Sequence, residues 1–322
     1  MTKTKSIKIV QFTHPGGEHK ISRAQIKAGD MIKAWNTEDH KRKFLHTTGA
    51  CVENGKKTEE NDIYFWGEWE PDSKVSLIDN PGGDHYPHFI HEPFVKIDPS
   101  GQLIVPNRKI IKDEDGKPIK IKIPANTDPF VFGEDGFYYS CCKQNKKGNP
   151  TQLQELEQGS IILFGSTIKP NTPDAYFALD TVFVVGPNRD YNRDSYLKKL
   201  KDFTPKYYCD IMNSKSWIGN LEFTCYQSVN YASPINGMYS FVPCKIGAEG
   251  ENGFERVKLT KECFELITKN LGHSEYFQHK LNSAPKITES NIDDNLKIWT
   301  RLRKIIEEQG FKEAARLDYT EK

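Results

Sequence analysis

No apolar run in this 322-residue sequence approaches the roughly 20 residues that an α-helix needs to cross a bilayer. The first residues, MTKTKSIKIVQF, contain no apolar block followed by small residues, so we expect neither a membrane segment nor a signal peptide. Neither sign of charge dominates, because 45 Lys and Arg oppose 44 Asp and Glu and leave a formal net charge of +1. This balance argues against a polycationic nucleic-acid coat and against an acidic disordered chain.

Several motifs of common enzyme and metal-binding classes are also missing. The seven cysteines form no CxxC pair, and an odd, scattered set is a poor disulfide framework. We therefore expect reduced, mostly buried thiols in a cytoplasmic protein. The P-loop pattern, GxGxxG, HExxH and GxSxG do not occur, which argues against the enzyme classes that use them. No local signature supports a cysteine–histidine nucleophile.

Aromatic residues are abundant, and the order of the expected elements favours an α+β fold. The 18 Phe, 14 Tyr and 5 Trp supply apolar surface for a large core. Because strands and helices do not alternate regularly, we expect a curved, mostly antiparallel sheet or a β-barrel with peripheral helices, and not a doubly wound parallel sheet. The expected strands are 6–13, 62–70, 102–105, 118–123, 136–142, 161–165, 176–186, 221–227 and 238–246, and the expected helices are 22–35, 193–203, 260–271 and 293–309.

A polar stretch in the middle of the chain, KQNKKGNPT at 143–151, is the best candidate for a domain boundary or a long loop. It separates residues 1–145, a strand-rich region with many His and aromatic residues, from residues 146–322, which mix strands and helices. The two regions form either two domains or one continuous domain.

Histidine is concentrated near the amino terminus, where seven of the nine histidines lie within the first 91 residues. His14 and His19 flank one Pro-Gly-Gly turn, and His85 follows a second turn of the same pattern. A histidine beside a carboxylate is a competent acid–base pair near neutral pH, and glycine-rich turns let backbone N–H groups approach an anion. The candidate catalytic residues are His14, Glu18, His19, His85 and His88.

A divalent metal is an alternative use of this cluster, because imidazoles bind zinc, manganese or iron. The candidate ligands are His85, His88 and His91, which recur at intervals of three residues. Pro87 and Pro93 favour extended chain there, and residues three apart on an extended chain do not share a face. Whether the protein uses a metal is left open, as is a third interpretation in which the histidines form a hydrogen-bonded surface without catalytic function.

Cations and aromatic rings accompany the histidines. Arg42 and Lys43 belong to a basic run, and Trp35, Trp66 and Trp69 supply flat stacking surfaces. Cation, aromatic ring and imidazole together suit a nucleotide or the end of a nucleic acid. The alternative is that the tryptophans belong to the core and that the basic run is a solvated face.

The middle of the chain resembles a known family. Leu156, Gly159 and Ser160 precede the apolar run IILFGS, and a second strand reads FALDTVFVVG at 177–186. Residues 156–186 are similar to part of a PUA-like barrel of the EVE and ASCH type, except that Ser160 stands where those domains have an acidic residue. The resemblance implies a PUA-like β-barrel with peripheral helices that binds RNA or DNA, in several cases around a flipped or modified base. Residues that could surround such a base are Trp66, Trp69, Tyr138, Tyr139, Tyr226, Gln227 and Tyr231.

We therefore expect a protein that recognises nucleic acid or a modified nucleotide, in the setting of bacterial nucleic-acid modification or defence that the resemblance implies. The rival hypothesis is an enzyme that processes a nucleotide or phosphodiester with the amino-terminal His, Glu and Asp residues, with or without a metal. A third is an assembly subunit whose aromatic surface contacts a protein partner. Whether the protein is an enzyme stays open at this point.

Overall fold

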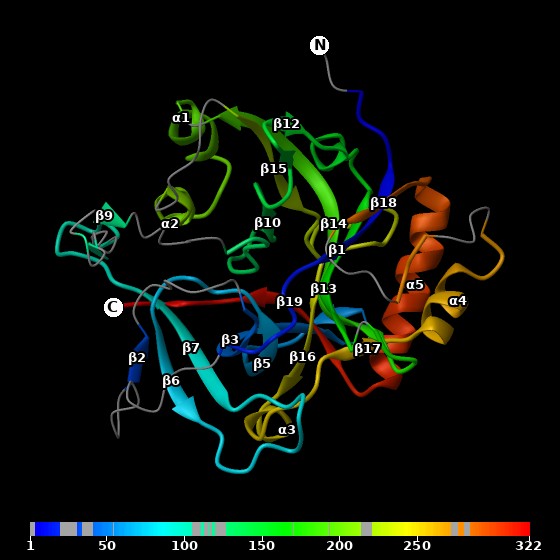
Figure 1. Ribbon diagram of the computed structural model, residues 1–322, viewed down its shortest axis with the longest axis horizontal. Helices are drawn as coiled ribbons and strands as arrows, with labels where there is room; N and C mark the ends of the chain where they lie inside the picture. The colour runs from blue at the N-terminus through cyan, green and yellow to red at the C-terminus, as the bar shows by residue number, and fades with distance from the viewer. Residues whose placement is uncertain are drawn as a thin grey trace.

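The computed structural model has a mainly β architecture in which helices are few and peripheral (Figure 1). Its strands form two large sheets in which most pairs are antiparallel. The α+β class expected from the sequence is therefore confirmed. The structure describes residues 4–19, 31–33, 41–53, 55–104, 111–112, 115, 118–119, 127–169, 171–192, 194–213, 221–271, 276–279 and 284–322.

The first sheet is built around two strands that are apolar along most of their length. β13 (Ile161–Ile168) and β14 (Tyr176–Asn192) pair antiparallel, with a bulge after Phe164. A Cβ at Gly165 would overlap the carbonyl oxygen of Ala178, so this close approach requires glycine. The other strands of the sheet are β1 (Lys8–Thr13), which is parallel to β13, and β10 (Tyr138–Tyr139), β15 (Glu222–Ser228), β17 (Val257–Leu259) and β18 (Lys286–Glu289).

The second sheet closes part of itself into a small four-stranded barrel. β3 (Lys43–Glu53) pairs with β5 (Asn61–Gly67) and with β19 (Lys312–Leu317), while β16 (Val242–Ile246) joins β5 to β19. Beyond β3 the sheet continues through β7 (Phe89–Val95), β6 (Ser73–Leu77) and β2 (Met31–Lys33), and β4 (Lys56–Lys57) and β20 (Thr320–Glu321) add short edges to β3 and β7.

Both sheets combine strands from either side of residue 145. β1 lies in the sheet of β13, β14 and β15, whereas β16 and β19 complete the barrel begun by β3 and β5. The regions 1–145 and 146–322 expected from the sequence therefore exchange strands. The polar stretch between them contains a hairpin of β11 (Asn145–Lys146) and β12 (Asn149–Pro150), which the 3₁₀ helix η2 (Gln152–Gln154) follows. Elsewhere in the chain, β8 (Ile111–Lys112) pairs with β9 (Pro118–Ile119) in a second small antiparallel pair.

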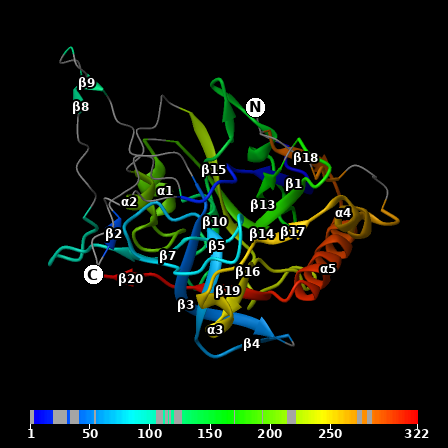
Figure 2. The ribbon, with the colours of Figure 1, turned by 60° about the horizontal axis from the view of Figure 1, so that its bottom comes forward.

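Two longer helices lie together on one flank of the molecule, beside β17 (Figures 1 and 2). They are α4 (Lys261–Thr268) and α5 (Ile292–Glu308). The side chain of Asn291 caps α5 by accepting the N–H of Asp294, and Trp299 Nε1 donates to the carbonyl of Tyr239 (2.9 Å). Shorter helices are α1 (Tyr196–Leu200), α2 (Tyr208–Asn213) and α3 (Ala248–Glu251).

The helices expected near 193–203, 260–271 and 293–309 correspond to α1, α4 and α5. The expected helix at 22–35 lies mostly outside the described residues, and its described part, 31–33, is strand β2. Within the part of the chain that the structure describes, none of the helices has the length and apolar character needed to cross a membrane.

The two sheets share one buried cluster, which includes Val10 and Phe164 from the first sheet and Leu45 and Phe65 from the second. The end of β5, the start of β3, the first part of β14 and the residue before β17 meet near this cluster and supply the four charged side chains described next. The end of β1 adds His14 beside them.

Candidate functional site

Four buried charged side chains form an alternating chain between the sheets. Arg42 Nη2 lies 3.0 Å from Glu68 Oε1, and Arg42 Nε lies 3.3 Å from Asp180 Oδ2. Asp180 Oδ1 in turn lies 3.4 Å from Arg256 Nη1. The order Glu68, Arg42, Asp180, Arg256 alternates in sign and sums to no net charge. This balance offsets the several kcal/mol that each buried ion would cost alone.

Strand register explains how these residues come together. Lys43 pairs with Gly67 in the β3–β5 ladder, so Arg42 and Glu68 both come one residue beyond the last pair. In the β13–β14 ladder, Phe164 pairs with Thr181 and Gly165 with Leu179, which leaves Asp180 as the extra residue of the bulge. A bulge re-aims the side chain of its extra residue. Here it turns Asp180 towards the two arginines.

Arg256 fastens the first Pro-Gly-Gly turn to the sheet. Its Nη1 donates to Ser166 Oγ (2.9 Å), and its Nη2 donates to the carbonyl of Gly16 (2.8 Å). Burial lowers the pKa of Arg256, and the nearby Asp180 carboxylate opposes that effect.

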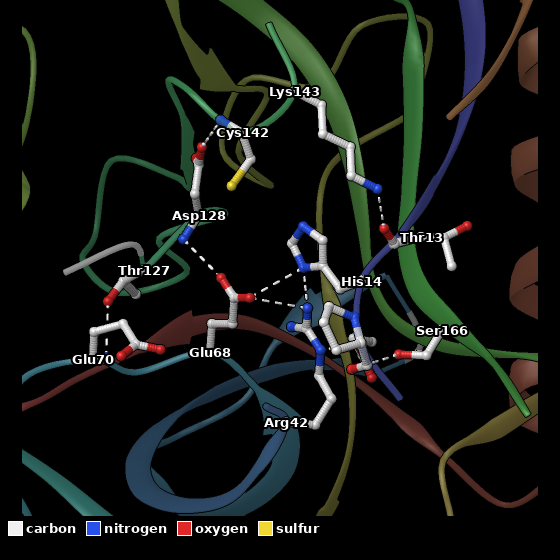
Figure 3. A network of polar contacts seen from close by, with 12 residues as sticks. Thr13, His14, Arg42, Glu68, Glu70, Thr127, Asp128, Cys142, Lys143 and Ser166 are labelled. Atoms are coloured by element: carbon white, nitrogen blue, oxygen red, sulfur yellow. Dashed lines mark hydrogen bonds and ion pairs between the residues drawn. The ribbon is translucent and has the colours of Figure 1, made fainter. Parts of the chain in front are cut away.

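His14, directly after β1, extends this network on the side of Glu68 (Figure 3). Its Nδ1 lies 3.1 Å from Glu68 Oε1 and also contacts Arg42 Nη2. Because a guanidinium can only donate, Nδ1 cannot bond to both groups, and we assign the bond to Glu68. Burial opposes a charge on the ring, but the Glu68 carboxylate and polar interactions with Cys142 and Glu68 outweigh it, so the pKa of His14 is raised.

Asp128 shapes the turn that carries Cys142. Its Oδ1 accepts the N–H of Ser140 (2.9 Å), and its Oδ2 accepts the N–H groups of Cys141 (2.8 Å) and Cys142 (2.7 Å). The N–H of Asp128 itself donates to Glu68 Oε2 (3.1 Å). The turn is therefore connected directly to the buried network.

Lys143, the next residue, places an ammonium group near the same point. Its Nζ donates to the carbonyl of Thr13 and lies 4.9 Å from the centre of the Phe12 ring. Burial lowers the pKa of Lys143, and the charge of Arg42 lowers it further, whereas Cys142 and Glu68 oppose this shift. Figure 3 shows Cys142 and Lys143 on the side of the His14 ring that is opposite Arg42.

One group of three potential metal ligands occurs among the described residues: Asp128, Cys141 and Cys142, whose ligand atoms lie within 4.8 Å of one another. Asp128 Oδ2 already accepts two amide hydrogens, which occupies both of its lone pairs, and Oδ1 accepts a third. A metal would have to displace these bonds, so the set does not fit a resident cation without reshaping the turn. The candidate ligands His85, His88 and His91 belong to no such group in the described chain.

A pocket of about 210 Å³ lies beside Arg256, between the two Pro-Gly-Gly turns. Gly16 and Gly17 line it from the first turn, and His85 and His88 line it from the second. The repeated sequence pattern thus corresponds to two turns that face one ligand-sized space.

Glu18 ties the two turns together. Its Oε1 accepts the backbone N–H groups of His88 (2.7 Å) and Phe89 (3.2 Å), and its Oε2 lies 2.9 Å from His88 Nδ1. The Glu18 side chain is 8% exposed, whereas that of His88 is 42% exposed. The pocket therefore presents an imidazole that a buried carboxylate orients.

Aromatic rings form the inner wall of the pocket. The Arg256 guanidinium lies 5.4 Å from the centre of the Trp66 ring, and Trp66 Nε1 donates to the carbonyl of Phe254 (2.7 Å). Tyr176 also lines the pocket, and burial raises its pKa to about 12, so its phenol is neutral at physiological pH. The pocket combines a cation, flat rings and imidazoles.

Four residues that the sequence analysis selected therefore meet in this pocket: Glu18, His85, His88 and Trp66. His14 and Arg42 lie in the buried network beside it. His19 and His91 are buried with ring centres 5.8 Å apart, and they do not line the pocket.

The other selected residues are placed differently from expectation. Lys43 is completely buried with its Nζ 3.5 Å from Glu70 Oε1, and Arg42 is 1% exposed, so neither of these two basic side chains belongs to a solvated face. Trp69 belongs to the core, which was the alternative interpretation of the tryptophans, and its Nε1 donates to the carbonyl of Asp72 (2.8 Å). Trp35 lies outside the described residues.

Tyr226 and Gln227 lie on β15, apart from this pocket. Tyr226 is buried and stacks on Tyr139 with ring centres 6.0 Å apart. Gln227 Nε2 donates to the carbonyl of Asp135 (3.0 Å) and to Tyr138 Oη (3.2 Å). Both residues hold strands together, and the pocket-lining residues do not include them.

Several residues of the site were not selected from the sequence, among them Asp180, Arg256 and Cys142. Asp180 stood out as a charge inside the apolar run FALDTVFVV, which is a usable signal for a buried ion pair. Arg256 and Cys142 carry no comparable local signal, because only the tertiary structure brings them to the site. No known family model, curated protein or solved structure matches this chain.

Proposed function

We propose that this protein recognises a nucleotide, or the end of a nucleic acid, by holding one base in the pocket between the two Pro-Gly-Gly turns. The observation that carries the proposal is the combination of Trp66, Tyr176 and Arg256 with the imidazoles of His85 and His88 around one small space. Flat rings stack on any base, and imidazole and carboxylate groups hydrogen-bond to base edges.

The size of the pocket limits the ligand. Its volume of about 210 Å³ lies below the about 300 Å³ at which pockets for drug-sized molecules begin. A single base or nucleoside matches this volume better than a dinucleotide does. The phosphate would then lie at the mouth, near the backbone of Gly16 and Gly17.

The net charge supports the same kind of ligand. A formal charge of +1 provides little general attraction to a polyphosphate chain, so affinity must come from local contacts. Binding should therefore depend weakly on salt and strongly on the identity of the base. The PUA-like resemblance of residues 156–186 agrees with this proposal and remains a prediction.

The test is binding of the full chain to mononucleotides and to short single- and double-stranded DNA and RNA, with and without modified bases, at two salt concentrations. We expect one ligand class to bind in a salt-resistant manner and His85→Ala to weaken that binding about tenfold, which corresponds to about 1.4 kcal/mol, within the range of one lost hydrogen bond. His46→Ala is the matched control, because His46 stacks on Tyr64 outside the pocket (ring centres 4.4 Å apart). Equal binding by the two variants, or no binding to any ligand, would refute the proposal.

The Glu18–His88 pair favours a second candidate, an enzyme that uses His88 as a general base on the bound nucleotide. A carboxylate 2.9 Å from Nδ1 fixes the tautomer and leaves Nε2 as the proton acceptor. His88→Gln would then abolish turnover of the bound nucleotide while its dissociation constant changes less than tenfold. Unchanged nucleotide in a prolonged incubation with the wild-type protein would reject this candidate and leave recognition alone.

A further inference from the structure

None of the seven cysteines forms a disulfide bond, and their surroundings differ. Five are buried, whereas Cys142 and Cys263 are half-buried. Cys263 Sγ lies 3.5 Å from Thr260 Oγ1 and 3.7 Å from the carbonyl oxygen of Lys258, which are uncharged groups. Cys142 lies instead beside the imidazole of His14 and precedes Lys143 (Figure 3). Two half-buried thiols therefore differ in their chemical surroundings.

His14 connects Cys142 to a carboxylate. One ring nitrogen, Nδ1, lies 3.1 Å from Glu68 Oε1. The other, Nε2, is buried and makes no hydrogen bond of normal geometry among the described residues, and His14 as a whole is 7% exposed. The side chain of Cys142 interacts with this imidazole, whose Nδ1 already faces Glu68. Figure 3 shows the Nε2 side of the ring facing the region of Cys142 and Lys143.

Glu68 is itself held in place, which makes it suitable for orienting an imidazole. Its Oε2 accepts the N–H of Asp128 (3.1 Å), and its Oε1 faces Arg42 Nη2 (3.0 Å). Asp128 in turn fixes the backbone of Cys142 (2.7 Å). Thiol, imidazole and carboxylate are thus tied into one rigid unit.

We propose that Cys142 is a nucleophilic thiol, with His14 as its general base and acid and Glu68 as the residue that positions His14, and that it accepts an acyl group from an ester or amide. A nucleophile next to a base that a third group orients is the arrangement shared by enzymes that use covalent acyl intermediates. Thiols beside histidine or lysine side chains are the reactive ones in proteins. The residues involved are separate from those lining the nucleotide pocket, so the inference does not depend on the proposed function.

The reaction balances without an oxidant or a metal. Sγ of Cys142 transfers its proton to His14 Nε2 and bonds to the carbonyl carbon of the substrate. The C–O or C–N bond breaks, and Nε2 returns the proton to the departing alcohol or amine. Water then gives a proton to Nε2 and bonds to the same carbon, the C–S bond breaks, and the proton returns to Sγ. The products are a carboxylic acid and an alcohol or amine.

The first test treats the full wild-type chain with p-nitrophenyl acetate and measures acetylation of each cysteine by peptide mass spectrometry. We expect Cys142 to be acetylated at least tenfold faster than Cys263. Because both thiols are half-buried, the acetylation rate of Cys263 shows how fast a thiol of similar exposure reacts without a neighbouring histidine. Equal rates at the two cysteines would overturn the proposal without the need for any variant.

The second test measures alkylation by iodoacetamide as a function of pH. The titratable and charged groups around Cys142 are His14, Lys143, Glu68, Arg42, Asp128, Cys141 and Tyr139, whose hydroxyl donates to the carbonyl of Cys142 (2.6 Å). We expect alkylation of Cys142 to rise at a lower pH than that of Cys263 in the wild type.

Variants of the two partners separate the roles. We expect His14→Gln to shift the Cys142 profile to higher pH and to slow its acetylation about tenfold, with Cys263 unchanged. Glu68→Gln should produce a smaller shift in the same direction, which a purely structural role would not. If folded His14→Gln protein, verified by circular dichroism, reacts as the wild type does, His14 is not the base and the proposal fails.

Discussion

Asp180 is the most informative single position of the buried network, because one neutral substitution there unbalances four charges. Asp180→Asn keeps the shape of the side chain but removes the carboxylate between Arg42 and Arg256, which lie 3.3 and 3.4 Å away. Glu68 alone would then face two buried guanidinium groups. Leaving one buried charge unpaired typically costs about 3 to 5 kcal/mol, and we expect Asp180→Asn to lower the free energy of unfolding by that amount.

The matched control lies ten residues further along the same strand. Asp190 is exposed and accepts a hydrogen bond from Thr224 Oγ1 (2.6 Å), so Asp190→Asn should cost about 1 kcal/mol or less. The assay is urea-induced unfolding followed by tryptophan fluorescence at neutral pH. If the two variants lose the same stability to within about 1 kcal/mol, the alternating-charge explanation is wrong.

A double-mutant cycle tests the cause of the loss. Arg256→Met alone leaves a buried negative charge, whereas Arg256→Met combined with Asp180→Asn leaves the neutral pair of Arg42 and Glu68. We therefore expect the double variant to lose clearly less than the sum of the two single losses, by about 1 to 3 kcal/mol. Additive losses would show that Asp180 and Arg256 act independently.

Three further predictions concern stability. The pKa of His14 is raised, so the stability contributed by its protonated ring is complete below its ordinary pKa of 6.5 and is lost as pH rises through the higher folded-state pKa. His14→Gln should therefore make the melting temperature depend less on pH over that range. Parallel pH profiles of the melting temperature for the wild type and the variant would contradict this. Gly165→Ala should destabilise by about 3 kcal/mol because its Cβ meets the carbonyl of Ala178, as measured by urea unfolding, and a wild-type midpoint would show that the bulge can open. Asn291→Ala should cost about 1 kcal/mol through loss of the α5 cap, and thermal unfolding with no change would mean that another group caps Asp294.

The elements with the strongest apolar patterns could be predicted from the sequence. The apolar runs around Leu163 and Val184 became β13 and β14, and the amphipathic stretch around Trp299 became α5. The strand β3 was missed because its start looks like a basic surface run. Lys43 is buried there only because Glu70, on another segment, neutralises it. Long-range charge pairing of this kind has no local signature.

In the candidate site too, some residues had a local signal in the sequence, whereas others are brought together only by the tertiary structure. The repeated Pro-Gly-Gly pattern and the excess of histidine pointed to the turns around Glu18 and His85, and in the structure both turns line one pocket. The exchange of strands between the halves of the chain placed Arg256 against Trp66, a contact that no spacing rule could reveal. For the same reason, Cys142 and His14 are 128 positions apart in the sequence and adjacent in space.

The bulge that carries Asp180 also has a consequence for the fidelity of folding. A slip of β14 by one residue against β13 would present Leu179 or Thr181 to the two arginines and would bury Asp180 in an apolar layer. Each misaligned pairing would therefore contain unmatched ions, whereas the apolar residues of β13 and β14 alone would tolerate several alignments. Asp180 thus favours the correct alignment of β14 over its nearest competitors, and it can do so only once Arg42 of the second sheet lies beside β14.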